Sequence, residues 1–215
     1  MKFFLIILLL FSLLACTGIP IIKPASDAEK NMLITKSQAP FLKSKWRLVH
    51  SINGTLPGGA TVSMIGISIA SPENAGLHCT LMSIEGLVVL DADYEGGLTI
   101  NRGIGPFKSE DFAMGIIRDV RLILFQPGGR VTETGSMMDG NKVCRYRSED
   151  GVTDVVMKVD GTAEIHSFDK SLKLSRIVVF GKMRQDGIPV KIELTGYGLF
   201  QYDLELDLLE AEIIR

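Results

Sequence analysis

The sequence has little of what marks the common enzyme classes. It contains three cysteines, three histidines and one tryptophan among 215 residues. It has no Gly-x-Ser-x-Gly nucleophile turn and no His-Glu-x-x-His zinc motif, and no Gly-Gly pair precedes the Lys-Ser or Lys-Thr of a phosphate loop. The apolar run Phe3–Leu14 is about a dozen residues long, well short of the roughly 20 that span a bilayer. We therefore expect no catalytic residues, no cofactor and no permanent transmembrane helix.

Positive charge is not in excess either. The 23 lysines and arginines are outnumbered by 25 aspartates and glutamates, which gives a formal net charge of −2. Nucleic-acid-binding domains usually carry a basic surface, so nucleic acid is not expected as a partner. Hydrophobic residues at 46% and charged residues at 22% are typical of a folded globular domain.

The N-terminus has a pattern of its own. Lys2 precedes the apolar run, which ends in Leu13-Leu14-Ala15-Cys16. This arrangement resembles a bacterial lipoprotein signal peptide, in which small residues precede the cleaved bond and the cysteine thiol accepts a diacylglyceryl group as a thioether. The resemblance implies that residues 1–15 are removed and that Cys16 is lipidated. An ordinary secretory signal with an accidental cysteine is the alternative.

Thr17 occupies the position where an aspartate would indicate retention in the inner membrane under the Gram-negative sorting rule. We therefore expect a lipid anchor at the periplasmic face of the outer membrane. Residues 16–40 contain three prolines and no sustained periodicity, so they are predicted to form a tether, and 24 flexible residues would reach roughly 27 Å. Within it, Ser26-Asp27-Ala28-Glu29 has capping-box spacing and predicts a short helix that could pack on the domain.

From Phe41 onward, short runs with β-strand alternation are separated by glycine-rich turns. Asn53-Gly54 is predicted to close the first strand, and Glu85-Gly86 is a hairpin signal. Strands are expected over residues 45–52, 61–70, 77–84, 87–93 and 98–102, and again over 130–134, 142–147, 153–159, 162–168, 173–183, 190–194 and 199–213.

One helix interrupts these strands. Ser109 is a typical N-cap, Glu110 and Asp111 suit the first turn, and apolar residues at helical spacing continue to Phe125, where Gln126-Pro127-Gly128-Gly129 ends the pattern. Many antiparallel strands around one long helix predict a mainly β fold. We expect a strongly curved antiparallel sheet or incomplete β-barrel with the helix packed in its concave face.

The order of these features resembles the LolA/LolB superfamily, the periplasmic carrier and outer-membrane receptor of lipoproteins. The resemblance rests on Cys16, the tether, a first strand with Trp46-Arg47-Leu48, the central helix, and a last hairpin that begins at Gly187–Leu194. It covers about residues 41–213 of a predicted domain that spans residues 41–215. It implies an apolar cavity between sheet and helix that accepts acyl chains of a lipoprotein or lipid.

If such a cavity exists, its wall would be formed by apolar side chains of the first strand and of one helix face: Trp46, Leu48, Phe112, Ile116 and Val120. The same side chains could instead fill the core completely. A cavity would favour a binding protein without covalent chemistry. A completely filled core would favour a non-catalytic structural or assembly lipoprotein that contacts an envelope protein.

Cysteine, histidine and aspartate are the other residue types here that could carry chemistry. Cys79 and Cys144 could form a disulfide in an oxidising compartment, or remain two small buried thiols. His50, His78 and His166 are expected to be structural, because none has a metal-ligating neighbour at suitable spacing and His78 and Cys79 point to opposite strand faces. No metal site is therefore expected. Asp91 and Asp93 share a strand face, where solvated carboxylates are commoner than a catalytic pair. A hydrolase is the least favoured function, because no nucleophile and base can be paired.

Overall fold

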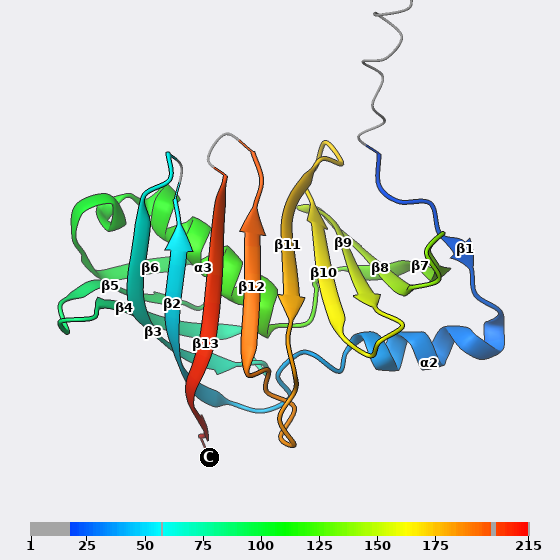
Figure 1. Cartoon of the computed structure of the whole chain (residues 1–215), viewed down its shortest axis with the longest axis horizontal. Helices are drawn as coiled ribbons and strands as arrows, with labels where there is room; N and C mark the ends of the chain where they lie inside the picture. Colours follow the sequence, from blue (N-terminus) through cyan, green and yellow to red (C-terminus); the bar gives the residue numbers. More distant parts are fainter. Residues whose placement is uncertain (1–17, 57, 199–200, 215) are drawn as a thin grey trace, which may run out of the picture.

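The strands form one antiparallel sheet whose two halves meet through the first and last long strands (Figure 1). This computed structural model describes residues 18–56, 58–198 and 201–214. Within them, the strand order is β1-β7-β8-β9-β10-β11-β12-β13-β2-β3-β4-β5-β6. The strands are β1 (Lys23–Pro24), β2 (Trp46–Thr55), β3 (Thr61–Ser71), β4 (Gly76–Ser83), β5 (Val88–Tyr94), β6 (Leu98–Gly103), β7 (Arg130–Ser136), β8 (Lys142–Ser148), β9 (Gly151–Met157), β10 (Ala163–Phe168), β11 (Leu174–Phe180), β12 (Lys191–Gly196) and β13 (Tyr202–Ile213).

Two meanders are joined edge to edge. Strands β2 to β6 follow one another in space, as do β7 to β13, and β13 pairs with β2 from Asp203 opposite Thr55 to Ile213 opposite Trp46. β1 and β6 form the two edges of the sheet, which stays open. The predicted mainly β, strongly curved antiparallel sheet is confirmed.

The first hairpin differs from its prediction. Asn53-Gly54 does not close β2 but continues it, with Gly54 paired to Val62 of β3. The glycine is required for packing, because a Cβ at this position would lie 2.7 Å from Leu204 Cδ2 of β13. A glycine inside a strand can thus mark close side-chain approach as well as a turn.

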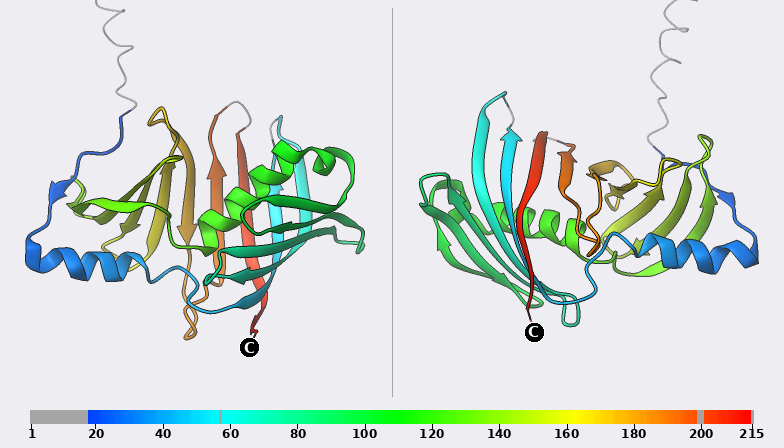
Figure 2. Two further views of the ribbon diagram at one scale, coloured as in Figure 1. Left: turned by 180° about the vertical axis from the view of Figure 1, so that it is seen from behind. Right: turned by 60° about the horizontal axis from the view of Figure 1, so that its bottom comes forward.

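The long helix α3 (Glu110–Leu124) crosses the concave face of the sheet (Figure 2). It follows the 3-10 helix η1 (Gly105–Lys108). The Ser109 side chain accepts a hydrogen bond from the Phe112 backbone N–H, and two acidic residues occupy the first turn, as the sequence predicted. Ala113 and Ile117 are fully buried against the sheet. The helix therefore supplies one wall of the main apolar core.

The residues before β2 belong to the fold. Helix α2 (Asp27–Ser37) confirms the predicted short helix, and it packs on β7, β8 and β9. Its Leu33 is 1% exposed, and its Ser37 hydroxyl hydrogen-bonds the Tyr146 hydroxyl at 2.8 Å. The sequence predicts a tether outside the core over residues 16–40, and the structure differs from Pro20 onward. The physical reason is burial of apolar side chains that lack sustained periodicity.

This N-terminal segment encloses the sheet edge on both faces. β1 pairs with β7, with Lys23 opposite Ser136. Ile22 packs with Val143 and Val156 on one face, whereas α2 lies over Tyr146 on the other. Val143 and Tyr146 lie three residues apart in β8, so their side chains point to opposite faces.

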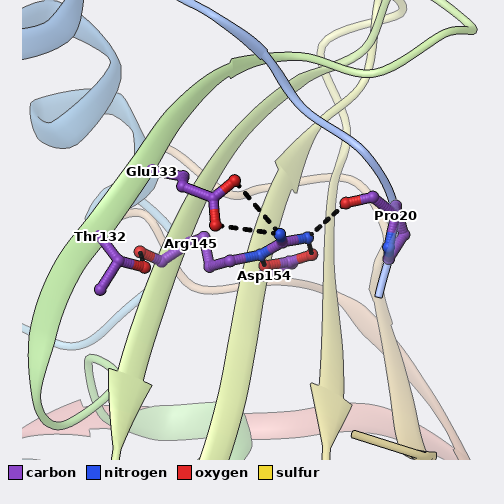
Figure 3. Close-up of polar contacts among 5 residues, drawn as sticks. All are labelled: Pro20, Thr132, Glu133, Arg145 and Asp154. Carbon is purple, nitrogen blue, oxygen red and sulfur yellow. Dashed lines mark hydrogen bonds and ion pairs between the residues drawn. The ribbon is translucent and has the colours of Figure 1, made fainter. Parts of the chain in front are cut away.

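A buried ion pair stabilises the same edge (Figure 3). Arg145 of β8 donates two hydrogen bonds of 2.7 Å to Asp154 of β9, and both residues are almost completely buried. The guanidinium also contacts Glu133 at 3.3 Å and donates to the Pro20 carbonyl at 2.8 Å. One side chain thus joins three strands to the N-terminal segment.

Candidate functional site: the cavity beneath helix α3

Helix α3 is held to the sheet by polar contacts near its middle. The Asp119 carboxylate accepts hydrogen bonds from Arg176 Nε of β11 and from the Tyr202 hydroxyl of β13. Burial raises the pKa of the Tyr202 hydroxyl, so this group remains protonated and keeps donating to Asp119. The Tyr202 ring lies over Gly196 of β12, where a Cβ would lie 2.2 Å from the ring.

A second attachment lies nearer the end of the helix. Arg121 Nη1 donates to the Ala75 carbonyl at 2.6 Å, in the turn between β3 and β4. Its guanidinium carbon also lies 4.5 Å from the centre of the Tyr94 ring and 5.2 Å from that of Phe125. Cation–π contacts of this kind stabilise both the arginine and the rings that it covers. Asp119 and Arg121 therefore fasten the helix at points on different strands.

A small cavity lies between α3 and the sheet. Its volume is about 30 Å³, which is room for one or two water molecules. Most of its lining is aliphatic and comes from the helix and from strands on both sides of the β13–β2 junction. The lining residues are His50, Ile52, Gly66, Ser68, Cys79, Leu81, Val120, Ile123, Leu124, Ile192 and Leu206.

His50 is the unusual member of this lining. It is 6% exposed, and its Nε2 atom is buried without a hydrogen-bond partner among the described residues. Burial lowers the pKa of His50 to about 4, although the nearby Asp207 carboxylate opposes this shift. The imidazole is therefore neutral at neutral pH. The alternation of β2 places His50 on the same strand face as Trp46 and Leu48, and the sequence predicts only a structural role for it, with no indication that Nε2 would be unpartnered.

The five residues expected in the cavity wall have different environments. Val120 lines the cavity. Trp46 and Leu48 are buried in the surrounding core, and Ile116 is half-buried against it. Phe112 is 46% exposed and packs edge-to-face on Phe107 of η1, with ring centres 5.4 Å apart. The α3 face that points to the cavity is therefore centred on Val120 and extends toward Ile123 and Leu124 rather than toward the start of the helix.

The two cysteines are free and buried. Cys79 is in β4 and Cys144 in β8, and seven strands lie between these two in the sheet, namely β9 to β13 with β2 and β3. The structure thus has the second of the two alternatives, and the disulfide is not formed. Burial raises the pKa of the Cys79 thiol to about 12 and also raises that of Cys144, so both remain protonated.

The remaining charged clusters lie away from the cavity. His78 Nδ1 is 2.8 Å from Asp93 Oδ1, and Asn101 donates to both Asp91 and Asp93. The two carboxylates do share a face, as expected from the sequence, and these hydrogen bonds lower the pKa of Asp93.

His166 also has a carboxylate as its neighbour. Its Nε2 atom lies 3.0 Å from a Glu164 carboxylate oxygen, and Lys158 lies 3.1 Å from the other oxygen of the same group. Across residues 18–56, 58–198 and 201–214, no three histidine, cysteine, aspartate or glutamate side chains are grouped so that they could hold a metal ion. We therefore take the apolar cavity, and not a charged cluster, as the candidate site.

Comparison with known proteins identifies the architecture. No protein-family model and no curated protein matches the sequence. Among solved structures, a LolA superfamily protein from Nitrosomonas europaea superimposes with a TM-score of 0.59 over 86% of this chain and 93% of that one, at 9% identity. The chain has the LolA superfamily fold. At this identity, the match establishes the fold alone.

Two further solved structures align less closely with this LolA-like chain. One is a candidate outer membrane lipoprotein-sorting protein domain from Vibrio parahaemolyticus, with a TM-score of 0.49, 12% identity, and coverage of 87% of this chain and 93% of that one. The other is a DUF1329 family protein from Desulfovibrio piger, with a TM-score of 0.47, 12% identity, and coverage of 89% and 94%.

The predicted lipidation site, Cys16, and the signal sequence before it lie outside the described residues. Within the part of the chain that the structure describes, no helix is both long and apolar enough to cross a membrane.

Proposed function

We propose that this protein is a lipid-anchored component of the bacterial envelope that binds acyl chains of a lipoprotein or lipid between α3 and the concave face of the sheet. The observation that carries this proposal is the aliphatic cavity beneath a helix that is fastened by a few polar side chains. The LolA superfamily fold, which the chain shares with the solved Nitrosomonas europaea protein, supports the same function.

Acyl binding requires α3 to move outward. The cavity of about 30 Å³ is far smaller than a fatty acyl chain, so under this proposal the structure corresponds to a closed form. As the helix moves away from the sheet, an incoming chain would replace Val120, Ile123 and Leu124 against the strands. Burial of each methylene contributes about 0.8 kcal/mol, so a chain of a dozen carbons can offset the loss of the helix contacts. Binding of this kind needs no covalent chemistry and no cofactor.

The anchor proposal rests on the sequence. Cys16 would carry two or three acyl chains after cleavage, and two such chains already hold a protein stably on a membrane. With Thr17 after the cysteine, the expected location is the periplasmic face of the outer membrane. The partners are then the membrane itself and the lipid or lipoprotein whose acyl chains are bound.

The test is native mass spectrometry of lipids that remain bound to the purified full chain. A lipid adduct is expected for the wild type and should be lost in Val120→Glu, because a carboxylate in the aliphatic cavity excludes an acyl chain. Arg118→Glu is the matched control, since it places the same charge on the exposed side of the same helix. Val120→Phe fills the cavity without adding a charge and should also lose the adduct. A wild type that never binds lipid, or a Val120→Phe variant that binds as well as the wild type, would contradict acyl binding.

A structural or assembly role is the second candidate, and a separate observation favours it. Ile84 and Leu87, in the turn between β4 and β5, are 68% and 50% exposed, and Ile104 and Phe112 are also exposed. Ile104 N–H donates to the Val89 carbonyl at 2.9 Å, which brings η1 beside this turn. An envelope defect in Ile84→Glu/Leu87→Glu with unchanged lipid adducts would support a protein-contact role at this surface.

A further inference from the structure

We infer that His50 and Ser68 form the polar recognition point of the cavity and bind the carbonyl oxygen of an ester- or amide-linked acyl chain. This inference rests on the proposed acyl-binding function and specifies the chemical group that the cavity selects. It assigns a specificity-determining role to a histidine whose buried ring nitrogen serves no structural contact in the described residues.

The first observation is the unpartnered Nε2 atom. Buried polar atoms in native proteins nearly always have a hydrogen-bond partner, because a donor or acceptor without one loses its interaction with water and gains nothing in return. His50 Nε2 is buried in a lining that is otherwise mostly aliphatic, and it has no such partner in the described part of the chain. A bound group with one hydrogen-bonding atom would satisfy it.

The second observation is the strand register, which brings Ser68 beside His50. Leu48 pairs with Ser68 and His50 pairs with Gly66 across β2 and β3, so His50 and Ser68 are diagonal neighbours on the same face. Ser68 is also buried and lines the same cavity. Its hydroxyl and the imidazole can therefore approach a single ligand atom together.

Gly66, directly opposite His50, adds no side chain to the cavity at this position. A Cβ there would lie 2.7 Å from Ile52 Cδ1, so any larger residue would force the Ile52 side chain to move. The glycine therefore preserves the space beside the imidazole.

The charge of the lining selects among acyl compounds. Among the residues that the structure describes, no lysine or arginine lines the cavity, and a neutral imidazole is expected because the pKa of His50 is about 4. A carboxylate would then be buried without a counter-charge, which is strongly unfavourable. An uncharged carbonyl oxygen needs only a neutral donor, which the imidazole Nε2–H or the Ser68 hydroxyl can provide. The aliphatic remainder of the lining suits the alkyl chain attached to that carbonyl.

A single water molecule would also fit the cavity and is the simplest competitor. Well-held buried waters usually make about three hydrogen bonds. The cavity lining offers two strong side-chain partners, His50 and Ser68, because the Cys79 thiol is only a weak donor and acceptor. Two partners are fewer than a well-held water makes but are sufficient for a carbonyl oxygen, which needs only one or two donors.

The experiment compares four probes of equal chain length on the purified, delipidated full chain: methyl laurate, an N-lauroyl peptide, laurate and dodecane. We expect methyl laurate and the lauroyl peptide to bind about tenfold more tightly than dodecane, and laurate to bind no better than dodecane. Different affinities for the ester and the amide would show which linkage is preferred. His50→Leu should abolish the preference for a carbonyl while dodecane still binds. His50→Gln, which retains a side-chain donor, should recover part of the preference.

His166→Leu is the matched control, since this histidine does not line the cavity and its Nε2 atom already has a partner, a Glu164 carboxylate oxygen at 3.0 Å. Nitrogen-15 spectra of the wild type provide a readout that needs no variant. Methyl laurate should shift the Nε2 signal of His50 and leave the signals of the other two histidines in place.

Equal binding of methyl laurate and dodecane to the wild type, or an unshifted His50 signal at saturation, would overturn the carbonyl assignment and leave acyl binding intact. A failure of all four probes to bind would instead overturn the proposed function, and the carbonyl assignment with it.

Discussion

The two helices cover opposite ends of the same sheet in different ways. At the β7–β9 end, α2 and the segment before it enclose both faces, and the buried charges of Arg145 and Asp154 satisfy each other. Under α3, a cavity remains, and the Nε2 atom of His50 has no hydrogen-bond partner among the described residues. One end is therefore built for a single fixed arrangement, whereas the other retains the space and the polar atom that a ligand needs.

The largest expected effect is a loss of stability at the β7–β9 end of the sheet. Arg145→Ala leaves the Asp154 carboxylate, which is 0% exposed, without its counter-charge. Loss of one partner of a buried pair costs about 3 to 5 kcal/mol, and urea unfolding should show a decrease of this size. The exposed Arg147 on the same strand is the control, and Arg147→Ala should change stability by less than about 0.5 kcal/mol.

A double variant sharpens the interpretation of this edge. Arg145→Met/Asp154→Leu removes both charges and should be more stable than Arg145→Ala alone, because no isolated charge stays buried. Equal destabilisation by Arg145→Ala and Arg147→Ala would show that the pair does not hold this end of the sheet together.

An intermediate effect concerns pH at the cavity. The pKa of His50 is about 4 in the folded chain against about 6.5 when unfolded, so the unfolded state binds more protons as the pH falls below 6.5. Protonation of His50 therefore does not reduce the free energy of unfolding above pH 6.5, and it reduces this free energy progressively as the pH falls toward 4. The reduction amounts to about 2 kcal/mol between pH 7 and pH 5.

Urea unfolding at these two pH values measures this loss. His50→Gln should remove it, whereas His166→Gln should retain it, since His166 is partly exposed beside Glu164. A pH dependence that His50→Gln leaves unchanged would mean that the imidazole is not the group responsible.

The smallest expected effect concerns the attachment of α3 to the sheet. Tyr202→Phe removes the hydroxyl that donates to Asp119, one of the attachments of α3, and should lower stability by about 1 kcal/mol. Because the helix then opens more easily, affinity for an acyl probe should rise by about fivefold in a fluorescence titration. Tyr197→Phe, in the connection between β12 and β13, should change neither the stability nor the affinity for the acyl probe. Reduced affinity in Tyr202→Phe would show that α3 does not act as a cover over the cavity.

Much of the fold could be predicted because its signals are local. Alternation of apolar residues identified the long strands, and the Ser109 cap and helical spacing identified α3 within one residue of each end. The Glu149-Asp150-Gly151 turn even fixes Arg145 opposite Asp154 by counting outward along the hairpin. The burial of Arg145 and Asp154 could not be predicted, because it depends on the N-terminal segment. The Pro20 carbonyl that accepts a hydrogen bond from Arg145 is 125 residues away in the sequence.

The candidate site was less accessible to prediction for the same reason. Alternation placed His50 on the inner face, but the depth at which α3 lies over that face depends on contacts with β4, β11 and β13. Val120 was identified from helical spacing, whereas Phe112 has the same period yet lies beyond the edge of the core. Periodicity gives the direction of a side chain, but not how closely two elements pack.

If Cys16 carries a lipid anchor, the hydrogen bond between Arg145 and the Pro20 carbonyl limits how far the domain can stand from a membrane. Only three residues lie between Cys16 and Pro20, and the four Cα-to-Cα steps from one to the other span at most about 14 Å. A lipid at Cys16 would then hold the domain close to the bilayer, because the segment between Cys16 and Pro20 is too short to act as a long spacer. The β1–β7 edge of the sheet would stay beside the lipid headgroups, and the domain could pivot about that edge but could not travel freely above the bilayer.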